Sequence, residues 1–344
     1  MHNIYCAIFN RRARVKIAVL LGGTSMERDV SVASGTQVIS ALRSVGHNVL
    51  AVDSAQGVLN PSQEREFLVS GIDILPPSNL EDTGTCFLDM AEKIKIENPE
   101  LVFLALHGGF GEDGTIQSIL HRACLPYTGS NEQGSRNAMD KNIAKRMFFE
   151  AGIPTPKWLM APISKRAVQE ELGFPVIVKP NSQGSTLGLT LVENSTELEL
   201  AIDVAKQFDC AVMVEQYISG QELTVGILNG KALAVGEIIP DQGEIFDYAS
   251  KYQVGAAEEI FPAKVEQRIE EKIKRTALNA HQVLGLGSYS RVDFRMSEGG
   301  ELWVLEVNTL PGLSSGSLLP KSAKAMGIEF SQLCEKICQG AIKP

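Results

Sequence analysis

The sequence lacks the signatures of several large protein classes. No apolar run approaches the ~18 residues that a membrane-spanning helix needs, so no membrane segment is expected. The 344 residues include six cysteines and no C-x-x-C pair. Cysteines this sparse do not form a disulfide framework. The chain also has no P-loop, no dinucleotide-type glycine fingerprint, and neither H-E-x-x-H nor G-x-S-x-G. These absences argue against a disulfide scaffold, a dinucleotide oxidoreductase and the commonest hydrolases.

Positive charge is in short supply. Lysine and arginine total 32 against 41 acidic residues, which gives a net charge of −9. Sequence-independent binding of nucleic acid depends on a surplus of cations, so no nucleic-acid partner is expected. Hydrophobic residues make up 44% of the chain and charged residues 21%. This composition favours a globular protein of two to three domains, at roughly 150 residues each.

The first fourteen residues, MHNIYCAIFNRRAR, do not resemble a secretory signal, because the arginines follow the short apolar stretch. We interpret residues 1–14 as an N-terminal extension and expect the protein in a reducing cytoplasm. Near the other end, Cys334 and Cys338 lie four residues apart on a predicted helix. Core packing is the favoured interpretation of this pair, ahead of metal or redox use.

The first part of the chain alternates strands and helices. VKIAVLL at 15–21 and LVFLAL at 101–106 are nearly continuous apolar runs, typical of strands buried on both faces of a parallel sheet. A glycine turn follows each run, then a helical pattern, and a further strand is predicted at 49–53. This order predicts a doubly wound α/β domain over 15–129, in which ligands gather at the carboxyl ends of the strands.

The pattern then changes to α+β. A helix is predicted over 139–151, before the breaking prolines Pro154 and Pro156. The strands and helices expected after it fall in the ranges 175–180, 187–192, 195–207 (helix), 211–217, 223–228, 232–239, 265–284 (helix), 288–294, 301–308 and 328–338 (helix).

Polar side chains project from the last two predicted strands. Arg291 and Asp293 are two residues apart and share a face, as do Glu306 and Asn308. Two carboxylates and an amide on adjacent strands would form an all-oxygen site that suits Mg²⁺ better than zinc. Solvated polar faces of half-buried strands are an equally good interpretation from these strands alone. Three apolar neighbours are expected to face a core: Val292, Leu305 and Val307.

Other candidate residues lie beside glycine-rich turns and strand ends. Lys179 closes a buried strand before the loop NSQGSTLG, where backbone N–H groups and a lysine could hold phosphates. Lys141 begins a helix, Glu215 and Glu222 flank a strand exit, and His107 ends the strand before HGGFGEDG. Taken singly these signals are weak, because most glycine loops only turn the chain and most lone lysines are solvated.

Seven segments in the same order resemble the D-alanine–D-alanine ligase family of the ATP-grasp superfamily. The resemblance runs from about Val15 to the final helix. It rests on LGGTSMERDVS, ALHGGFGEDGTIQ, MDK at 139–141, VKPNSQGSTLG, DYASKY, SRVDF and EVNTLPGLSSGSL. It implies an ATP-grasp fold whose central subdomain (130–218) and C-terminal subdomain (219–344) clasp ATP beside the N-terminal substrate domain.

The resemblance also implies a role for each matching residue. The ATP contacts would be Lys141, Lys179, Glu215, Gln216, Tyr217, Ile218, Glu222 and Lys251. Two Mg²⁺ or Mn²⁺ ions would be held by Asp293, Glu306 and Asn308. The first D-alanine would lie at Glu27 and His107, and Ser185 and Tyr252 would join Glu27 in a hydrogen-bonded group. Arg291 and the N–H of Gly312 would form an oxyanion hole, and Ser317 and Leu318 would hold the second D-alanine.

The implied activity is an ATP-dependent joining of two D-alanines through a D-alanyl phosphate, for peptidoglycan precursors, by a cytoplasmic homodimer. A ligase that takes D-lactate or D-serine second is the alternative within the family. Such relatives usually replace the Lys251–Tyr252 pair, so Tyr252 favours an amine. A nucleotide-binding protein without catalysis is a distant alternative, since it would be expected to lose Arg291 or a metal ligand.

Overall fold

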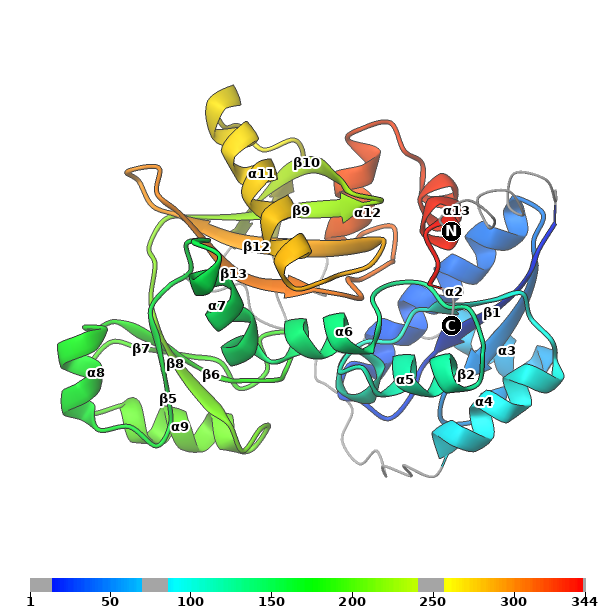
Figure 1. Ribbon diagram of the computed structural model, residues 1–344, viewed down its shortest axis with the longest axis horizontal. Helices are drawn as coiled ribbons and strands as arrows, with labels where there is room; N and C mark the ends of the chain where they lie inside the picture. The colour runs from blue at the N-terminus through cyan, green and yellow to red at the C-terminus, as the bar shows by residue number, and fades with distance from the viewer. Residues whose placement is uncertain (1–13, 70–85, 241–256, 343–344) are drawn as a thin grey trace.

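The computed structural model describes residues 14–69, 86–240 and 257–342, and these residues contain three β-sheets (Figure 1). The first sheet belongs to the N-terminal part, and the other two lie between helices in the rest of the chain. Within the described residues, no helix combines the length and apolar character needed to cross a membrane.

The N-terminal sheet has the strand order β3-β2-β1-β4. Its strands are β1 (Lys16–Leu21), β2 (Asn48–Asp53), β3 (Gly57–Val58) and β4 (Leu101–Leu104). Strand β1 is parallel to β2 and to β4, as predicted, but β3 is antiparallel to β2. The predicted doubly wound domain is therefore confirmed, and a two-residue antiparallel strand after β2 is added at one edge of its parallel sheet.

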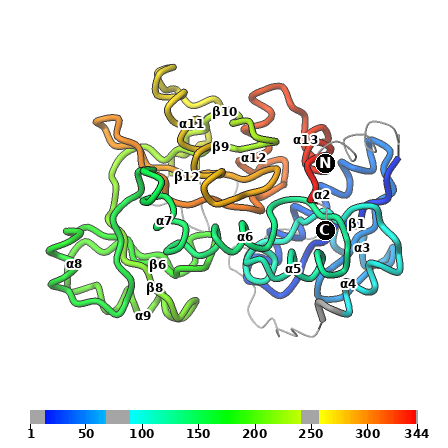
Figure 2. Tube along the Cα trace, viewed as in Figure 1, coloured from blue at the N-terminus to red at the C-terminus, as the bar shows by residue number. Residues whose placement is uncertain are grey.

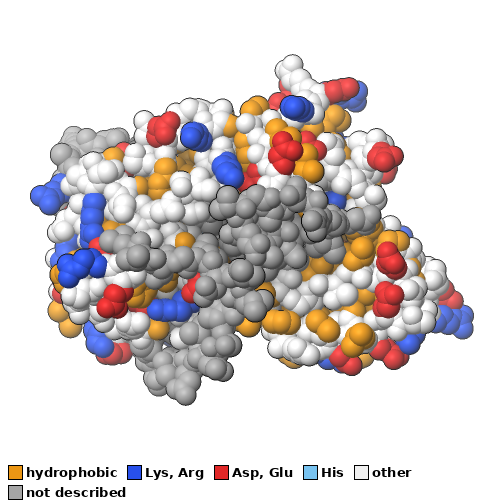
Figure 3. Space-filling model, turned by 180° about the vertical axis from the view of Figure 1, so that it is seen from behind, with side chains coloured by type: hydrophobic (Ala, Val, Ile, Leu, Met, Phe, Trp, Pro, Cys, Tyr) orange, Lys and Arg blue, Asp and Glu red, His pale blue; other side chains and the backbone are white. Residues whose placement is uncertain are grey.

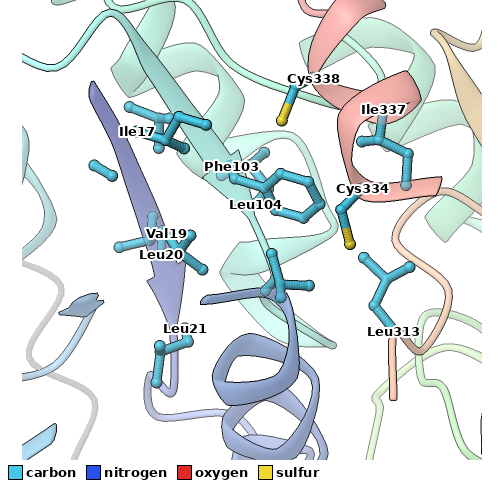
Figure 4. Packing of buried hydrophobic residues seen from close by; sticks show 14 of the residues in the cluster. Ile17, Val19, Leu20, Leu21, Phe103, Leu104, Leu313, Cys334, Ile337 and Cys338 are labelled. Atoms are coloured by element: carbon cyan, nitrogen blue, oxygen red, sulfur yellow. The ribbon is translucent and has the colours of Figure 1, made fainter. Parts of the chain in front are cut away.

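Helices cover this sheet on both sides. They are α2 (Arg28–Ser44), α3 (Pro61–Val69), α4 (Cys86–Ile96) and α5 (Thr115–Arg122), with a short 3₁₀ helix at Gly109–Gly111. The last helix, α13 (Phe330–Gln339), returns from the far end of the chain and packs on α2 (Figure 2). Its cysteines Cys334 and Cys338 point into the hydrophobic cluster beside Phe103 (Figure 4), which confirms their predicted core packing. Burial raises the pKa of Cys334 to about 12.

The second sheet is antiparallel, with the order β5-β8-β6-β7. It comprises β5 (Trp158–Met160), β6 (Val176–Pro180), β7 (Thr190–Val192) and β8 (Val212–Gln216), with α8 (Lys165–Glu171) and α9 (Leu198–Lys206). Because side chains alternate along a strand, Val176 and Val178 pack toward these helices while Lys179 points to the opposite face. One face of the sheet is thus left for the site.

The third sheet has the order β11-β10-β9-β12-β13. Its strands are β9 (Gln221–Leu228), β10 (Lys231–Pro240), β11 (Ala257–Ile260), β12 (Tyr289–Met296) and β13 (Leu302–Asn308). Helix α11 (Gln267–Val283) covers one face, where Val225 and Val292 are buried in the core. Helix α12 (Leu318–Lys324) lies on the other face, since a Cβ at Gly226 would meet Leu319.

The helix predicted over 139–151 begins after a break. Helix α6 (Glu132–Met139) ends at Asp140, whose extended backbone starts a second helix, α7 (Lys141–Glu150). The Asp140 carboxylate accepts a hydrogen bond from the N–H of Ile143 at 2.9 Å, which caps α7. The apolar side chains Ala144 and Phe148 of α7 pack with the core of the third sheet. Lys141 is thereby fixed at a helix start that faces the cavity.

Candidate active site

A cavity of about 520 Å³ opens between the second and third sheets and is closed at one end by loops of the N-terminal domain. Every predicted site residue that the structure describes lines this cavity, from Glu27 and His107 to Leu318. Two predicted residues, Lys251 and Tyr252, lie outside the described residues. Glu27 and Leu318 are 291 positions apart in sequence, yet both contribute side chains to one space.

Arg291, Asp293 and Asn308 form a hydrogen-bonded cluster on neighbouring strands. The guanidinium of Arg291 donates from Nη2 to Asp293 Oδ2 at 2.7 Å, and the amide of Asn308 donates to the same oxygen at 3.0 Å. Thr224 of β9 donates to Asp293 Oδ1 at 2.7 Å. The register pairs Arg291 with Asn308 and Asp293 with Glu306 across β12 and β13. The predicted shared face is therefore confirmed for these four residues.

A β-bulge in β13 changes the expected position of Leu305. The pairing of β12 with β13 shifts after Asp293, so Phe294 pairs with Val304 and Leu305 is the extra residue. Leu305 lines the cavity together with Glu306, although it was expected to face the core. Val292 and Val307 are buried, as predicted. An extra residue breaks the alternation of a strand, so two consecutive side chains reach the same face.

A buried carboxylate between two lysines links the second sheet to α7. Glu215 Oε1 lies 2.6 Å from Lys179 Nζ, and Glu215 Oε2 lies 2.6 Å from Lys145 Nζ. Lys145 Nζ also donates to Thr155 Oγ1 at 2.6 Å, whose hydroxyl donates to the Val304 carbonyl of β13. Burial is the largest influence on Lys145 and lowers its pKa to about 8. The chain Lys179–Glu215–Lys145–Thr155 therefore ties both sheets together beneath the cavity.

Lys141 faces the third sheet. Its ammonium donates to the Gln183 carbonyl at 2.6 Å and lies 3.3 Å from Glu306 Oε2. Gln183 belongs to the predicted glycine loop after β6. Lys141 and Lys179, the first two predicted ATP contacts, thus approach the cavity from a helix start and from a strand end.

Arg295 contacts two of the residues that are predicted to bind ATP. Arg295 Nη2 lies 3.4 Å from Glu222 Oε2, and its guanidinium lies 5.8 Å from the centre of the Tyr217 ring. Gln216 ends β8, Tyr217 and Ile218 follow it, and all three line the cavity.

Glu27 is enclosed by two glycine turns. Its carboxylate accepts a hydrogen bond from the Ser185 hydroxyl, although 158 positions separate the two residues. A Cβ at Gly108 would lie 2.5 Å from Glu27 Oε2, and one at Gly184 would lie 2.7 Å from it. Only glycine lets both backbones approach the carboxylate this closely. Ser185 itself has a φ of +51°, a strained conformation of the kind that often marks functional sites.

His107 is buried and neutral. Its Nε2 lies 3.0 Å from Ser34 Oγ. Burial, which is the largest influence, lowers the pKa of His107 to about 4, and nearby Arg291 adds to this effect. Burial, which is the largest influence, and the charge of nearby Glu27 raise the pKa of Glu112 to about 7. Glu112 was not singled out in the sequence, although the GEDG segment that contains it was.

The loop after β13 gathers the last predicted residues. A Cβ at Gly312 would meet Ser317 Oγ at 2.8 Å, so the two residues are in contact. The Ser317 hydroxyl oxygen accepts a hydrogen bond from the N–H of Ser314 at 3.2 Å. Ser317 is the residue before α12, whose first residue is Leu318.

The oxygen-rich cluster suits a hard divalent cation. Asp293, Glu306 and Asn308 offer only carboxylate and amide oxygens, which fit Mg²⁺ or Mn²⁺ rather than a softer metal. Among the residues that the structure describes, no three His, Cys, Asp or Glu side chains converge on one point. The protein would therefore supply few ligands, which is usual for a cation that also binds phosphate oxygens.

The residues that sequence reasoning missed are Ser34, Glu112, Lys145, Thr224 and Arg295. All of them except Glu112 form a hydrogen bond or ion pair with a predicted site residue. Lys145 lies one helical turn after Lys141 on the same helix. That i, i+4 spacing was the one available signal for Lys145.

Two sheets facing one polar cavity, beside a doubly wound domain, define the ATP-grasp class of protein. The chain belongs to the D-alanine–D-alanine ligase family. The family models named D-ala D-ala ligase N-terminus and D-ala D-ala ligase C-terminus match residues 16–130 and 147–339.

Individual relatives agree with this assignment. A D-alanine–D-alanine ligase of Trichlorobacter lovleyi is 39% identical, over 95% of this chain and 96% of its own length. The crystal structure of the Bacillus anthracis D-alanine–D-alanine ligase complexed with ATP has a TM-score of 0.74 at 31% identity, covering 95% of this chain and 96% of that one. The VanG D-Ala:D-Ser ligase of Enterococcus faecalis has a TM-score of 0.75 at 28% identity, covering 94% and 98%.

Proposed function

We propose that this protein is an ATP-dependent ligase that joins two molecules of D-alanine into D-alanyl-D-alanine. The observation that carries the proposal is the convergence on one cavity of Lys179, Arg291, Asp293, Glu306 and Asn308. A lysine and a metal site with oxygen ligands can neutralise phosphate charge during phosphoryl transfer. The guanidinium of Arg291 beside them can stabilise the oxyanion that forms during acyl transfer. Membership of the family makes D-alanine the expected substrate and ATP the expected co-substrate.

In the first step, a carboxylate oxygen of the first D-alanine attacks the γ-phosphorus of ATP. The bond from that phosphorus to the β,γ-bridging oxygen breaks, ADP leaves, and D-alanyl phosphate forms. Glu27 would hold the ammonium group of this substrate, and Lys141 and Lys179 would offset the phosphate charge. Such a reaction is accelerated mainly by positioning and charge stabilisation, which are what buried cations supply.

Asp293, Glu306 and Asn308 would hold Mg²⁺ or Mn²⁺ when nucleotide is bound, and the metal would neutralise phosphate charge. Arg291 and Asp293 are joined by hydrogen bonds in the cavity. Arg291 therefore already lies beside the metal ligands, where it can meet the acyl group formed next to the phosphates.

In the second step, the amine of the second D-alanine attacks the carbonyl carbon of D-alanyl phosphate. Arg291 and the N–H of Gly312 would stabilise the oxyanion of the tetrahedral intermediate. The C–O bond to phosphate then breaks, the amine proton leaves with the phosphate, and the amide bond remains. Ser317 and the start of α12 at Leu318 would hold the carboxylate of this second substrate, as helix N-termini favour anions. Tyr252 would favour an amine over a hydroxyl nucleophile at this step.

The remaining expectations belong to this proposal. We propose a homodimer in the cytoplasm that supplies peptidoglycan precursors. Division of the chain into 15–129, 130–218 and 219–344 also stays a prediction. On the face of the described chain shown in Figure 3, both acidic and basic side chains are present.

The test is ADP release by the purified protein with ATP and Mg²⁺. We expect release with D-alanine alone, in proportion to dipeptide formed, and none with L-alanine. Parallel samples with D-alanine plus D-lactate or D-serine are analysed by mass spectrometry. A protein that releases no ADP with D-alanine alone contradicts the proposal, and a dominant mixed product would assign the chain to the alternative ligases.

A further inference from the structure

The loop from Thr309 to Leu313, which follows β13, is fastened to the N-terminal domain by buried hydrogen bonds. The N–H of Leu310 donates to Glu112 Oε1 at 3.1 Å, and the N–H of Leu313 donates to Ser34 Oγ at 3.1 Å. The Leu313 side chain is buried in the hydrophobic cluster of the N-terminal domain beside Cys334 (Figure 4). Both ends of a five-residue loop are thus attached to a domain to which the loop itself does not belong.

Glu112 connects this loop to the turn after β4. Its second oxygen, Oε2, accepts a hydrogen bond from the N–H of Gly108 at 3.0 Å, in the turn that encloses Glu27. The residue is only 9% exposed, so water cannot readily replace either bond. One carboxylate therefore sets the distance between the Glu27 pocket and the Leu310 backbone.

Ser34 makes a second connection of the same kind. Its hydroxyl is shared between the Leu313 N–H and Nε2 of His107. His107 also forms a hydrogen bond with the backbone of Leu310. The loop is therefore held at Leu310 by Glu112 and His107 and at Leu313 by Ser34.

We propose that Glu112 and Ser34 are positioning residues for the second chemical step, acting through the Leu310 and Leu313 backbones on Gly312. This inference rests on the proposed function. Gly312 lies between the two fastened residues, so the direction of its N–H is fixed by theirs. The first substrate is held by the N-terminal domain and the oxyanion donor by the C-terminal loop. Glu112 and Ser34 hold these two parts of the site at a fixed separation.

Loss of either contact should affect the two steps unequally. Phosphoryl transfer depends on the lysines and metal ligands, which neither residue touches, and on the first D-alanine, which the assay supplies at saturation. Attack on the acyl phosphate depends on an N–H aimed at the oxyanion, and a shift of about 1 Å in such a group can cost about 100-fold in rate. When the second step is slow, water hydrolyses the acyl phosphate before the amine of the second D-alanine attacks it. The expected defect is therefore ADP formed without dipeptide.

The experiment compares Glu112→Gln, Ser34→Ala and the control Ser31→Ala. Glutamine keeps one acceptor but turns an amide N–H toward one of the two backbone donors. Ser31 is equally buried, lies one turn earlier on α2, and bonds Gly22 N and the Ala105 carbonyl instead of the loop. ADP and dipeptide are measured in the same samples at saturating ATP and D-alanine, and KM for ATP is measured separately.

We expect dipeptide formation by Glu112→Gln and Ser34→Ala to fall at least about 10-fold, with the KM for ATP unchanged. The ratio of ADP to dipeptide should rise to about two or more, whereas it stays at one in Ser31→Ala and the wild type. A variant that is merely less stable loses both products together. If both test variants fold and keep a ratio of one, the positioning role is wrong; if Glu112→Gln does not fold, Ser34→Ala decides. A wild type that makes no ADP with D-alanine contradicts the proposed function instead.

Discussion

Arg291 is the residue on which the two proposed steps separate. It donates to both oxygens of Asp293, yet it is expected to act on the acyl carbon rather than on ATP. Replacement by alanine should leave the Kd for ATP within about threefold and lower dipeptide formation by about 100-fold or more, since one oxyanion donor is worth ~3–4 kcal/mol. Calorimetric titration of ATP and a dipeptide assay check this. Wild-type turnover by Arg291→Ala would show that Arg291 is not an oxyanion donor.

The Glu112 carboxyl makes folding stability depend on pH. Its pKa is raised to about 7 by burial first and by Glu27 second, while Arg291 opposes the shift. A pKa above that of the unfolded chain means stability that is complete below about pH 4.5 and lost as pH rises through 7. The wild type should therefore lose roughly 3 kcal/mol relative to Glu112→Gln between pH 4.5 and 7.5.

Urea unfolding of both proteins across that range measures the difference. Neutral His107 contributes in the opposite direction between about pH 4 and its ordinary value of 6.5, because acid must charge it. That contribution is present in both proteins and largely cancels. A stability difference that does not change with pH would show that Glu112 titrates normally.

At the scale of the element, Gly226 in β9 holds α12 close to the third sheet. A Cβ there would lie 2.5 Å from Leu319 Cδ1 and 3.0 Å from Leu233 Cδ1. Gly226→Ala should therefore displace α12, which begins at Leu318, the predicted carboxylate site for the second substrate. We expect the KM for the second D-alanine to rise about 10-fold, with the KM for ATP unchanged. Steady-state kinetics test this, with Gly299→Ala as control, because a Cβ at Gly299 meets nothing closer than 3.6 Å. Equal kinetics of the two variants would contradict it.

The sequence predicted elements better than it predicted their edges and contacts. Buried runs such as Lys16–Leu21 and the same-face pair Arg291 and Asp293 follow from periodicity alone, and both are confirmed. The bulge at Leu305 and the antiparallel strand β3 depend on pairing with another strand, which no local pattern records. Lys145 and Glu112 were missed for a related reason, since their partners Glu215 and Leu310 lie 70 and 198 positions away.

At the scale of the whole molecule, the cavity is lined by the second sheet, the third sheet and the α2 and loop segments of the N-terminal domain. A ligand that fills it should therefore stabilise the entire chain. ATP at 100 times its Kd should add about 2.7 kcal/mol to the free energy of unfolding. For a chain of this size that corresponds to a rise in Tm of about 4 degrees. Scanning calorimetry with ATP and Mg²⁺ measures it, and Lys179→Ala should show a smaller rise at the same ATP concentration. An unchanged Tm would mean that nucleotide does not bind here.

The return of α13 to the first sheet has a consequence for biosynthesis. Cys334, Ile337 and Cys338 complete the hydrophobic cluster around β1 and β4, and Ile342 pairs with Tyr127 directly after them. Strand β1 leaves the ribosome roughly 300 residues before the helix that covers the cluster, and β4 roughly 230 residues before it. The earliest part of the nascent polypeptide must therefore keep an apolar surface uncovered until α13 has been synthesised.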